Sequence, residues 1–149
     1  MAHARELRLI ISVLMFVGSH GTYAQTYESL CDLQQQVARG SRRSVRVSGT
    51  YSSGVDMGVL ENAECTGQGT WVELALRSNQ NKKRLKKIMD TSGKVKVVFE
   101  GEFYGPPEPD LKLPESVRKA SNPGWGHLGA FKTKLVVYAI VEATQSSDH

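Results

Sequence analysis

Apolar and polar residues alternate with a period of two along much of the chain, which is the pattern of β-strands with one buried face. This alternation predicts strands over residues 44–51, 71–77, 94–104 and 130–142. A less regular strand, broken or bulged near Gly58, is predicted over residues 55–65. The side chains expected to face inward are Val45, Val47, Gly49, Tyr51, Val72, Leu74, Leu76, Val95, Val97, Phe99, Gly101, Phe103, Phe131, Leu135, Val137, Ala139 and Val141.

Two segments instead repeat their apolar residues at helical spacing. The first covers residues 27–38, where Leu30, Leu33 and Val37 share one face and Gly40 ends the run. The second covers residues 79–90, where the shared face consists of Leu85, Ile88 and Met89. Ser78 or Asn79 can cap the start of this second helix, and Gly93 can end it.

The predicted order is therefore one helix, three strands, one helix and two strands. This order predicts a mainly β fold, a five-stranded OB-fold-like Greek-key barrel with an N-terminal helix and a helix between strands three and four. Gly49 and Gly101 suit such a barrel, because tightly coiled strands use glycine where they bend. Residues 105–129 contain all five prolines and correspond to the loop that these barrels often enlarge for binding.

Four short stretches of the sequence also resemble a known group of proteins. They are VRVSGTY at residues 45–51, LENAEC at 60–65, VVFEGEF at 97–103 and GHLGAF at 126–131. Together they are similar to a functionally uncharacterised group of small secreted bacterial proteins, which share a V-x-V-x-G strand, a cysteine-closed second strand and a G-H-L-G-x-[FY] ending. The resemblance covers most of the chain after residue 24. It implies an OB-like fold and export, and it carries over no catalytic residue.

The first 24 residues have the organisation of a secretory signal peptide. Arg5 and Arg8 are followed by a nine-residue apolar run at residues 9–17, which is too short to span a bilayer. Cleavage is predicted after Ala24, although an uncleaved N-terminal anchor is the alternative. The mature chain is then a single OB-fold-like domain over residues 25–149, secreted or periplasmic in a bacterium, with no transmembrane segment.

Export places the two cysteines in an oxidising compartment, where such a pair normally forms a disulfide. Cys31 and Cys65 are therefore predicted to be bonded, closing a loop with a sequence separation of 34. A reactive thiol is the alternative, but it would need an activating histidine or a C-x-x-C spacing, and the sequence has neither near these cysteines.

Composition and motifs limit the chemistry that the chain can perform. Its 149 residues carry a net charge of +4, and removal of residues 1–24 leaves +3, so anionic partners are only weakly favoured overall. Of the four histidines, His127 alone can belong to a folded site, so no metal site and no cofactor are predicted. Common catalytic motifs are absent from the sequence. A secreted nuclease-like or other hydrolytic enzyme remains the alternative; its candidate charges are Asp56, Glu61, Glu64, Arg46 and Arg77.

The densest charge feature is the second helix, in which five of the six residues at 82–87 are cationic. In the functional interpretation, these residues bind a polyanion. The alternative is a solvated helix face opposite the apolar stripe. The five cations are Lys82, Lys83, Arg84, Lys86 and Lys87.

The second candidate region is the long segment before the last strand. Tyr104, Trp125 and His127 are candidate ligand-binding residues there, because aromatic rings with a polar partner suit sugar or base stacking. The alternative is a structural turn in which Trp125 packs on the barrel and His127 bonds to the backbone. The function predicted from the sequence is thus a non-enzymatic binding or envelope-associated module of unknown ligand, for which an anionic polymer and a saccharide are the candidates. A purely structural role, in which the barrel only packs on a partner, is a further alternative.

Overall fold

A computed structural model describes residues 26–54, 57–65, 67, 69–120 and 123–146. The predicted signal peptide and its cleavage site lie outside these residues. Within the described part of the chain, no helix has the length and apolar character needed to cross a membrane.

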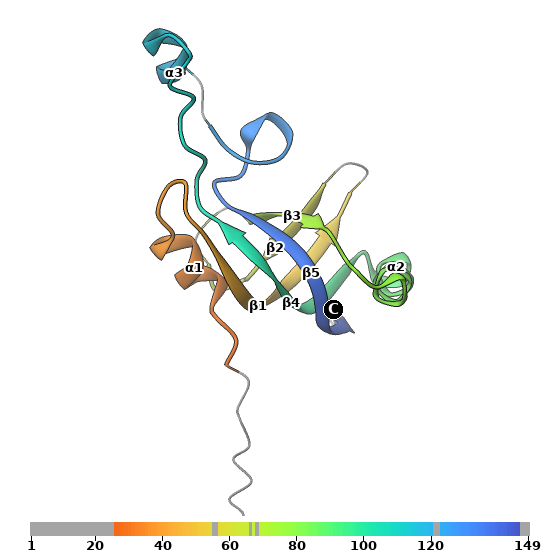
Figure 1. Cartoon of the computed structure of the whole chain (residues 1–149). Helices are drawn as coiled ribbons and strands as arrows, with labels where there is room; N and C mark the ends of the chain where they lie inside the picture. The colour runs from red at the N-terminus through yellow and green to blue at the C-terminus, as the bar shows by residue number, and fades with distance from the viewer. Residues whose placement is uncertain (1–25, 55–56, 66, 68, 121–122, 147–149) are drawn as a thin grey trace, which may run out of the picture.

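Five strands and three α-helices account for most of the described chain (Figure 1). In chain order the elements are α1 (Leu30–Gln36), β1 (Arg42–Ser53), β2 (Gly58–Glu61), β3 (Thr70–Leu74), α2 (Asn79–Ser92), β4 (Lys94–Tyr104), α3 (Glu115–Ala120) and β5 (Lys134–Gln145), with a 3-10 turn at His127–Gly129 before β5. The predicted order of one helix, three strands, a helix and two strands is confirmed. The helix α3 was not predicted.

The strands form one mixed sheet that closes on itself in the order β1-β2-β3-β5-β4, with β4 returning to β1. Four of the five pairings are antiparallel, and β3 with β5 is the parallel one. The prediction of a mainly β fold with five strands is thereby confirmed. We call this arrangement the closed sheet.

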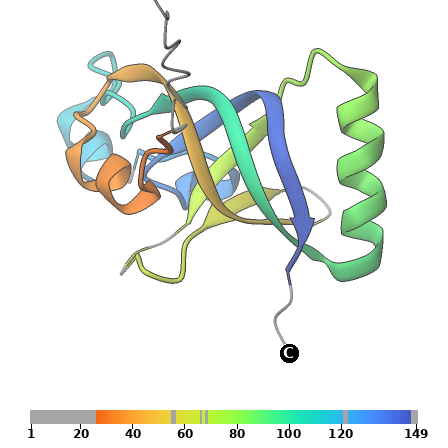
Figure 2. The same cartoon turned by 90° about the horizontal axis from the view of Figure 1, so that it is seen from below.

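The core fills the interior of the closed sheet with the side chains that the alternation predicted for β1 and β4. Val47, Phe99 and Phe103 have no solvent exposure, and Val45, Tyr51, Val95 and Val97 are also buried. Helices α1 and α2 lie on opposite sides of the closed sheet (Figure 2). Leu30 and Leu33 of α1 and Leu85 of α2 belong to the same buried cluster, so each helix covers the interior from its own side.

The last strand does not follow the predicted alternation, because two bulges shift its phase. Gly101 pairs with Val137 and Glu100 with Ala139, which leaves Tyr138 as an extra residue. A second shift leaves Val141 unpaired in the same way. The inward residues after Val137 are therefore Ile140 and Ala143, and the prediction that Ala139 and Val141 face the core is wrong.

Glycine is required at the first of these bulges. A Cβ at residue 101 would overlap the carbonyl oxygen of Val136 on the neighbouring strand. Only a residue without a side chain lets the two backbones approach this closely. The close approach of the two backbones is thus the steric reason for a glycine at residue 101.

Helix α1 has a covalent link to the segment between β2 and β3 and a polar link to the start of β3. The predicted disulfide joins Cys31 to Cys65, with Cα atoms 5.2 Å apart. On the same helix, Gln34 Nε2 donates to the hydroxyl of Thr70 at 3.0 Å, and this buried hydroxyl is 2.8 Å from that of Thr133. A helix of only seven residues has little stability of its own, so these links explain how it holds its place.

Between β4 and β5 the chain makes a long excursion over residues 105–133, which carries α3 away from the closed sheet (Figure 1). Residues 105–129 were predicted to be irregular, but they contain α3 and the 3-10 turn. The predicted last strand also begins too early, since β5 starts at Lys134. Phe131 therefore lies outside the strand and does not face the core, and its ring contacts Trp71 instead.

Candidate functional site

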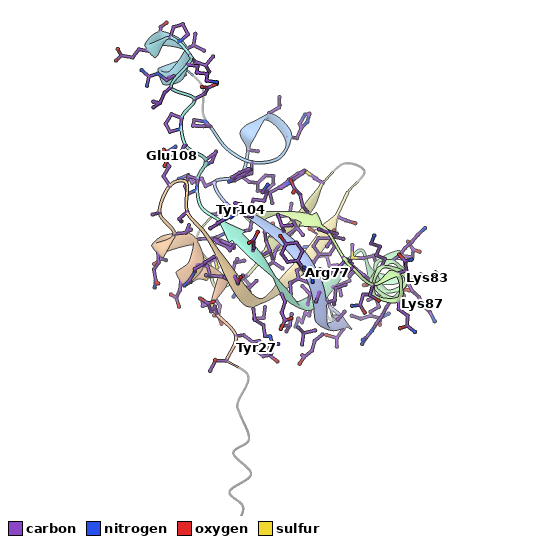
Figure 3. All side chains as sticks on the ribbon, in the orientation of Figure 1. Tyr27, Arg77, Lys83, Lys87, Tyr104 and Glu108 are labelled. Atoms are coloured by element: carbon purple, nitrogen blue, oxygen red, sulfur yellow. A yellow bond between two sulfur atoms is a disulfide. The ribbon has the colours of Figure 1, made fainter. Side chains whose placement is uncertain are left out.

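The register of the closed sheet brings three outward-facing residues into one row at the end of β4. Lys134 of β5 is the pairing partner of both Tyr104 of β4 and Trp71 of β3. Their chain neighbours Phe103, Leu135 and Val72 are buried on the inner face, so Tyr104, Lys134 and Trp71 face outward. Tyr104 lies where the chain leaves the sheet for the excursion (Figure 3).

Trp125 packs onto this row and uses its polar atom internally. Its indole Nε1 donates to the carbonyl oxygen of Gly105 at 2.9 Å. Its ring meets that of Tyr104 edge-on, with centroids 5.8 Å apart. Lys134 Nζ lies over both rings, 4.2 Å from the Trp125 centroid and 4.8 Å from the Tyr104 centroid. The same ammonium group is 3.5 Å from a carboxylate oxygen of Glu73, so its charge has a partner.

The segment around Trp125 is closed by its own backbone hydrogen bonds, and it lies against the ring of Trp71. Trp125 and Phe131 form an isolated antiparallel bridge, with N–H···O distances of 2.7 and 3.2 Å. Gly126 between them has φ of 72°, which favours glycine, and a Cβ there would overlap the ring of Trp71. Gly126 therefore allows a tight turn to lie directly against Trp71.

Of the three residues predicted to bind a ligand, the structure brings Tyr104 and Trp125 together. His127 instead starts the 3-10 turn, and its side chain is exposed. One face of each aromatic ring is already covered by Lys134, and the indole N–H is used by Gly105. This arrangement favours a packed clamp over an open stacking platform.

A carboxylate with two phenol donors extends this clamp along the outer face of β4. Glu102 Oε2 accepts hydrogen bonds from the hydroxyl of Tyr104 at 2.8 Å and from that of Tyr138 at 3.0 Å. The Tyr104 bond, followed by the Tyr138 bond, lowers the pKa of Glu102, and the same contacts raise the pKa of both tyrosines. The guanidinium of Arg77 lies 5.5 Å from the centre of the Tyr138 ring.

Sequence reasoning missed Lys134, Glu102 and Tyr138 as members of this cluster. Strand alternation could place Lys134 and Glu102 on an outer face. It could not show that they lie beside Tyr104, because that depends on the pairing of β4 with β5. Strand alternation could not even place Tyr138 on the outer face, because Tyr138 is the extra residue at a bulge.

The five predicted polyanion contacts lie together on α2, and all five are exposed. Lys83 and Lys87 project away from the closed sheet (Figure 3). Among the residues that the structure describes, none of the five cations of α2 forms an ion pair. The helix is tied to the core by Leu85 and ends as predicted at Gly93, whose φ is 66°. Its cations are thus presented on a fixed support and remain available to an external anion.

The charges considered for a hydrolytic enzyme do not converge. Glu61 and Glu64 line one surface groove, whereas Arg46 and Arg77 line another, in which Arg46 pairs with Glu100. Asp56 lies outside the described residues. Within the described ranges, no three histidine, cysteine, aspartate or glutamate side chains are grouped so that they could hold a metal ion.

Comparisons of the chain with protein-family models, with curated proteins and with solved structures find no match.

Proposed function

We propose that this chain is an exported, non-enzymatic binding module that contacts an anionic polymer through helix α2. The observation that carries the proposal is the set of five exposed cations on α2, which form no ion pair within the described part of the chain. A surface helix that is stabilised by its own salt bridges carries acidic residues three or four positions from its basic ones. Helix α2 has one acidic residue, Asp90, against five basic residues.

The physical basis of the contact is the release of counterions from the polymer. Each cation that neutralises a polymer charge releases condensed counterions, and affinity therefore falls steeply with salt. Helix α2 is suited to this because Leu85 is buried and Ile88 and Met89 pack on the core, which fixes the direction of the charged face. A fixed support reduces the ordering cost of binding.

The proposal also assigns the closed sheet to a specific fold type and the chain to a compartment. The strand order β1-β2-β3-β5-β4, the parallel β3–β5 pair and the helix between β3 and β4 support an OB-fold-like Greek-key barrel. Export to the periplasm or the medium is supported by the apolar run at residues 9–17 and by the pairing of Cys31 with Cys65, since disulfides persist in oxidising compartments. The resemblance to small secreted bacterial proteins agrees with both statements.

The polymer contact is tested by neutralising the outward-facing cations. The variant Lys83→Gln/Lys87→Gln should elute from heparin at lower salt than the parent. Its slope of log affinity against log salt on a duplex DNA probe should shrink by about 0.9 for each phosphate that the variant no longer neutralises. Folding should be unchanged, because both side chains are exposed.

A matched control removes two positive charges elsewhere. Lys112 and Lys132 are exposed and lie on the β4–β5 excursion, far from α2 in the sequence. The variant Lys112→Gln/Lys132→Gln has the same net charge as the α2 variant, so it should retain the parent's affinity. Equal losses of affinity in both variants would mean that net charge alone drives retention, and the α2 site would be rejected.

A further inference from the structure

A groove of about 380 Å³ lies between α2 and the adjoining ends of β1 and β3. Its volume lies within the usual range of small-molecule sites, roughly 300–1,000 Å³. The residues that line it are Tyr51, Ser53, Leu74, Leu76, Lys82, Leu85, Lys86, Met89 and Asp90.

The floor of this groove is apolar. Tyr51, Leu76 and Leu85 are buried members of the core cluster, and Met89 is half-buried against it. Leu74 pairs with Val137 across the parallel strands, so it shares the inner face of the closed sheet, as the alternation predicted. It is nevertheless 38% exposed. The exposed apolar surface of the groove is therefore supplied by Leu74 and Met89, which lie over the buried side chains of Tyr51, Leu76 and Leu85.

The rim of the groove is cationic on the side of α2. Lys82 and Lys86 are one helical turn apart and flank the apolar floor. Asp90, a turn further on, is the acidic residue of this lining. The remaining α2 lysines, Lys83 and Lys87, are not part of the lining and project away from the sheet (Figure 3). Two of the five α2 cations thus border the groove, and Lys83 and Lys87 do not.

We propose that this groove binds the acyl chain of a single-chain anionic lipid, a fatty acid, with the carboxylate held at Lys82 and Lys86. The apolar floor matches the chain, and the two ammonium groups at its edge match the negative head. This inference goes beyond the polymer contact and can fail or hold separately from it, because Lys83 and Lys87, the cations that test the polymer contact, do not line the groove.

Decanoate, kept below the concentration at which it associates, is a suitable probe. In protein with labelled leucine and methionine methyl groups, decanoate should shift the signals of Leu74, Leu76, Leu85 and Met89. Leu111 and Leu128 are 78% and 89% exposed on the β4–β5 excursion, and their signals should not move. From octanoate to decanoate, affinity should rise by about fourfold for each added methylene that is fully buried.

Variants separate the role of the head from that of the chain. Lys82→Gln/Lys86→Gln should weaken decanoate binding roughly threefold to tenfold while leaving decanol binding unchanged. Asp90→Asn should strengthen decanoate binding. Leu74→Gln should weaken both ligands, and its exposure makes it tolerable to the fold. The control Lys83→Gln/Lys87→Gln should bind decanoate like the parent, even where its retention on heparin has fallen.

Three results would overturn the proposal. Equal shifts at Leu111 and Leu128 would show adsorption to any exposed leucine, and equal affinity for octanoate and decanoate would show that no chain is buried. Shifts at the groove that depend on protein concentration without ligand would show that a second copy of the chain covers it. Loss of heparin retention in the Lys83/Lys87 variant does not bear on any of these readouts.

Discussion

The ammonium nitrogen of Lys134 lies 4.2 Å from the centre of the Trp125 ring, although Trp125 belongs to the β4–β5 excursion and Lys134 to β5. A cation over an aromatic face is attracted by the negative charge density of the ring. Because Glu73 also pairs with Lys134, the cation is held in place from two sides. The indole is thus clamped between a charged side chain and the backbone of Gly105.

This clamp predicts that Trp125 stabilises the fold. Trp125→Ala should lower the free energy of unfolding by roughly 2–4 kcal/mol, at the lower end of the range for truncated aromatic residues because the ring is half-buried. Thermal unfolding should show a fall in Tm of about 3–6 °C per kcal/mol for a domain of this size.

His127 is the natural comparison, since it lies two residues away and is exposed. His127→Ala should change stability by no more than about 0.5 kcal/mol. If Trp125→Ala proved as stable as the parent and had a lower affinity for a saccharide or polymer instead, Trp125 would be a ligand-binding residue and the clamp would have no structural role.

The disulfide predicts a strong dependence of stability on redox state. Folded protein should contain no titratable thiol, and reduction should cost about 3–4 kcal/mol, since the bond closes a loop with a sequence separation of 34. The melting temperature should fall by on the order of 10 °C. The variant Cys31→Ser/Cys65→Ser should match the reduced parent and show no further response to reductant. Two free thiols in native exported protein would contradict the pairing.

The two phenol donors to Glu102 predict a stability contribution that depends on pH. Since the folded-state pKa of Glu102 is lowered, its contribution is full above the ordinary glutamate pKa of about 4.3 and is lost as the pH falls through the lowered pKa. The stability difference between the parent and Glu102→Gln should therefore shrink on acidification below about pH 4.3.

Carboxyl NMR titration measures the same effect directly. Tyr104→Phe and Tyr138→Phe should each raise the pKa of Glu102 toward its ordinary value, with the larger change for Tyr104. Tyr27→Phe is the control, because the Tyr27 hydroxyl donates to Glu142. A Glu102 titration midpoint that no tyrosine replacement moves would show that the hydrogen bonds do not set its pKa.

The bulge in β4–β5 predicts that residue 101 must be glycine. Gly101→Ala should cost roughly 3 kcal/mol or prevent folding, because its methyl group would overlap a backbone carbonyl that cannot move away. At Gly54 the nearest atom to an added Cβ is 3.8 Å away, so Gly54→Ala should stay within about 0.5 kcal/mol of the parent. Circular dichroism shows whether each variant folds, and thermal melts compare the stability of those that do. Equal stability would refute the steric argument.

Much of the fold was predictable because burial has a period of two in β1 and β4, and each inward residue there is apolar. The inward and outward positions of β5 could not be predicted in the same way, because its bulges cannot be recognised from its own sequence. Helix α3 was missed, although Pro114 followed by Glu115 is a typical helix start. Its six residues are too few to show a period.

The candidate sites divide in the same way. The cations of α2 were predictable because they are adjacent in the chain and opposite an apolar stripe. The groove beside them was not, since Tyr51, Leu74 and Met89 meet only once the sheet closes and α2 packs on it. The contact of Lys134 with Trp125 could not be predicted from the sequence either, because it depends on where the excursion returns to the sheet.

The excursion leaves the closed sheet after Tyr104 and returns at Lys134, and these two residues face each other across β4 and β5. The sheet therefore holds the two ends together whatever lies between them. Doubling the length of such a segment costs only about 0.6 kcal/mol in closure entropy. The portion that carries α3 can accordingly be replaced by sequences of other lengths. The condition is that Trp125 keeps its contacts with Tyr104, Gly105 and Lys134, which close the segment beside the sheet.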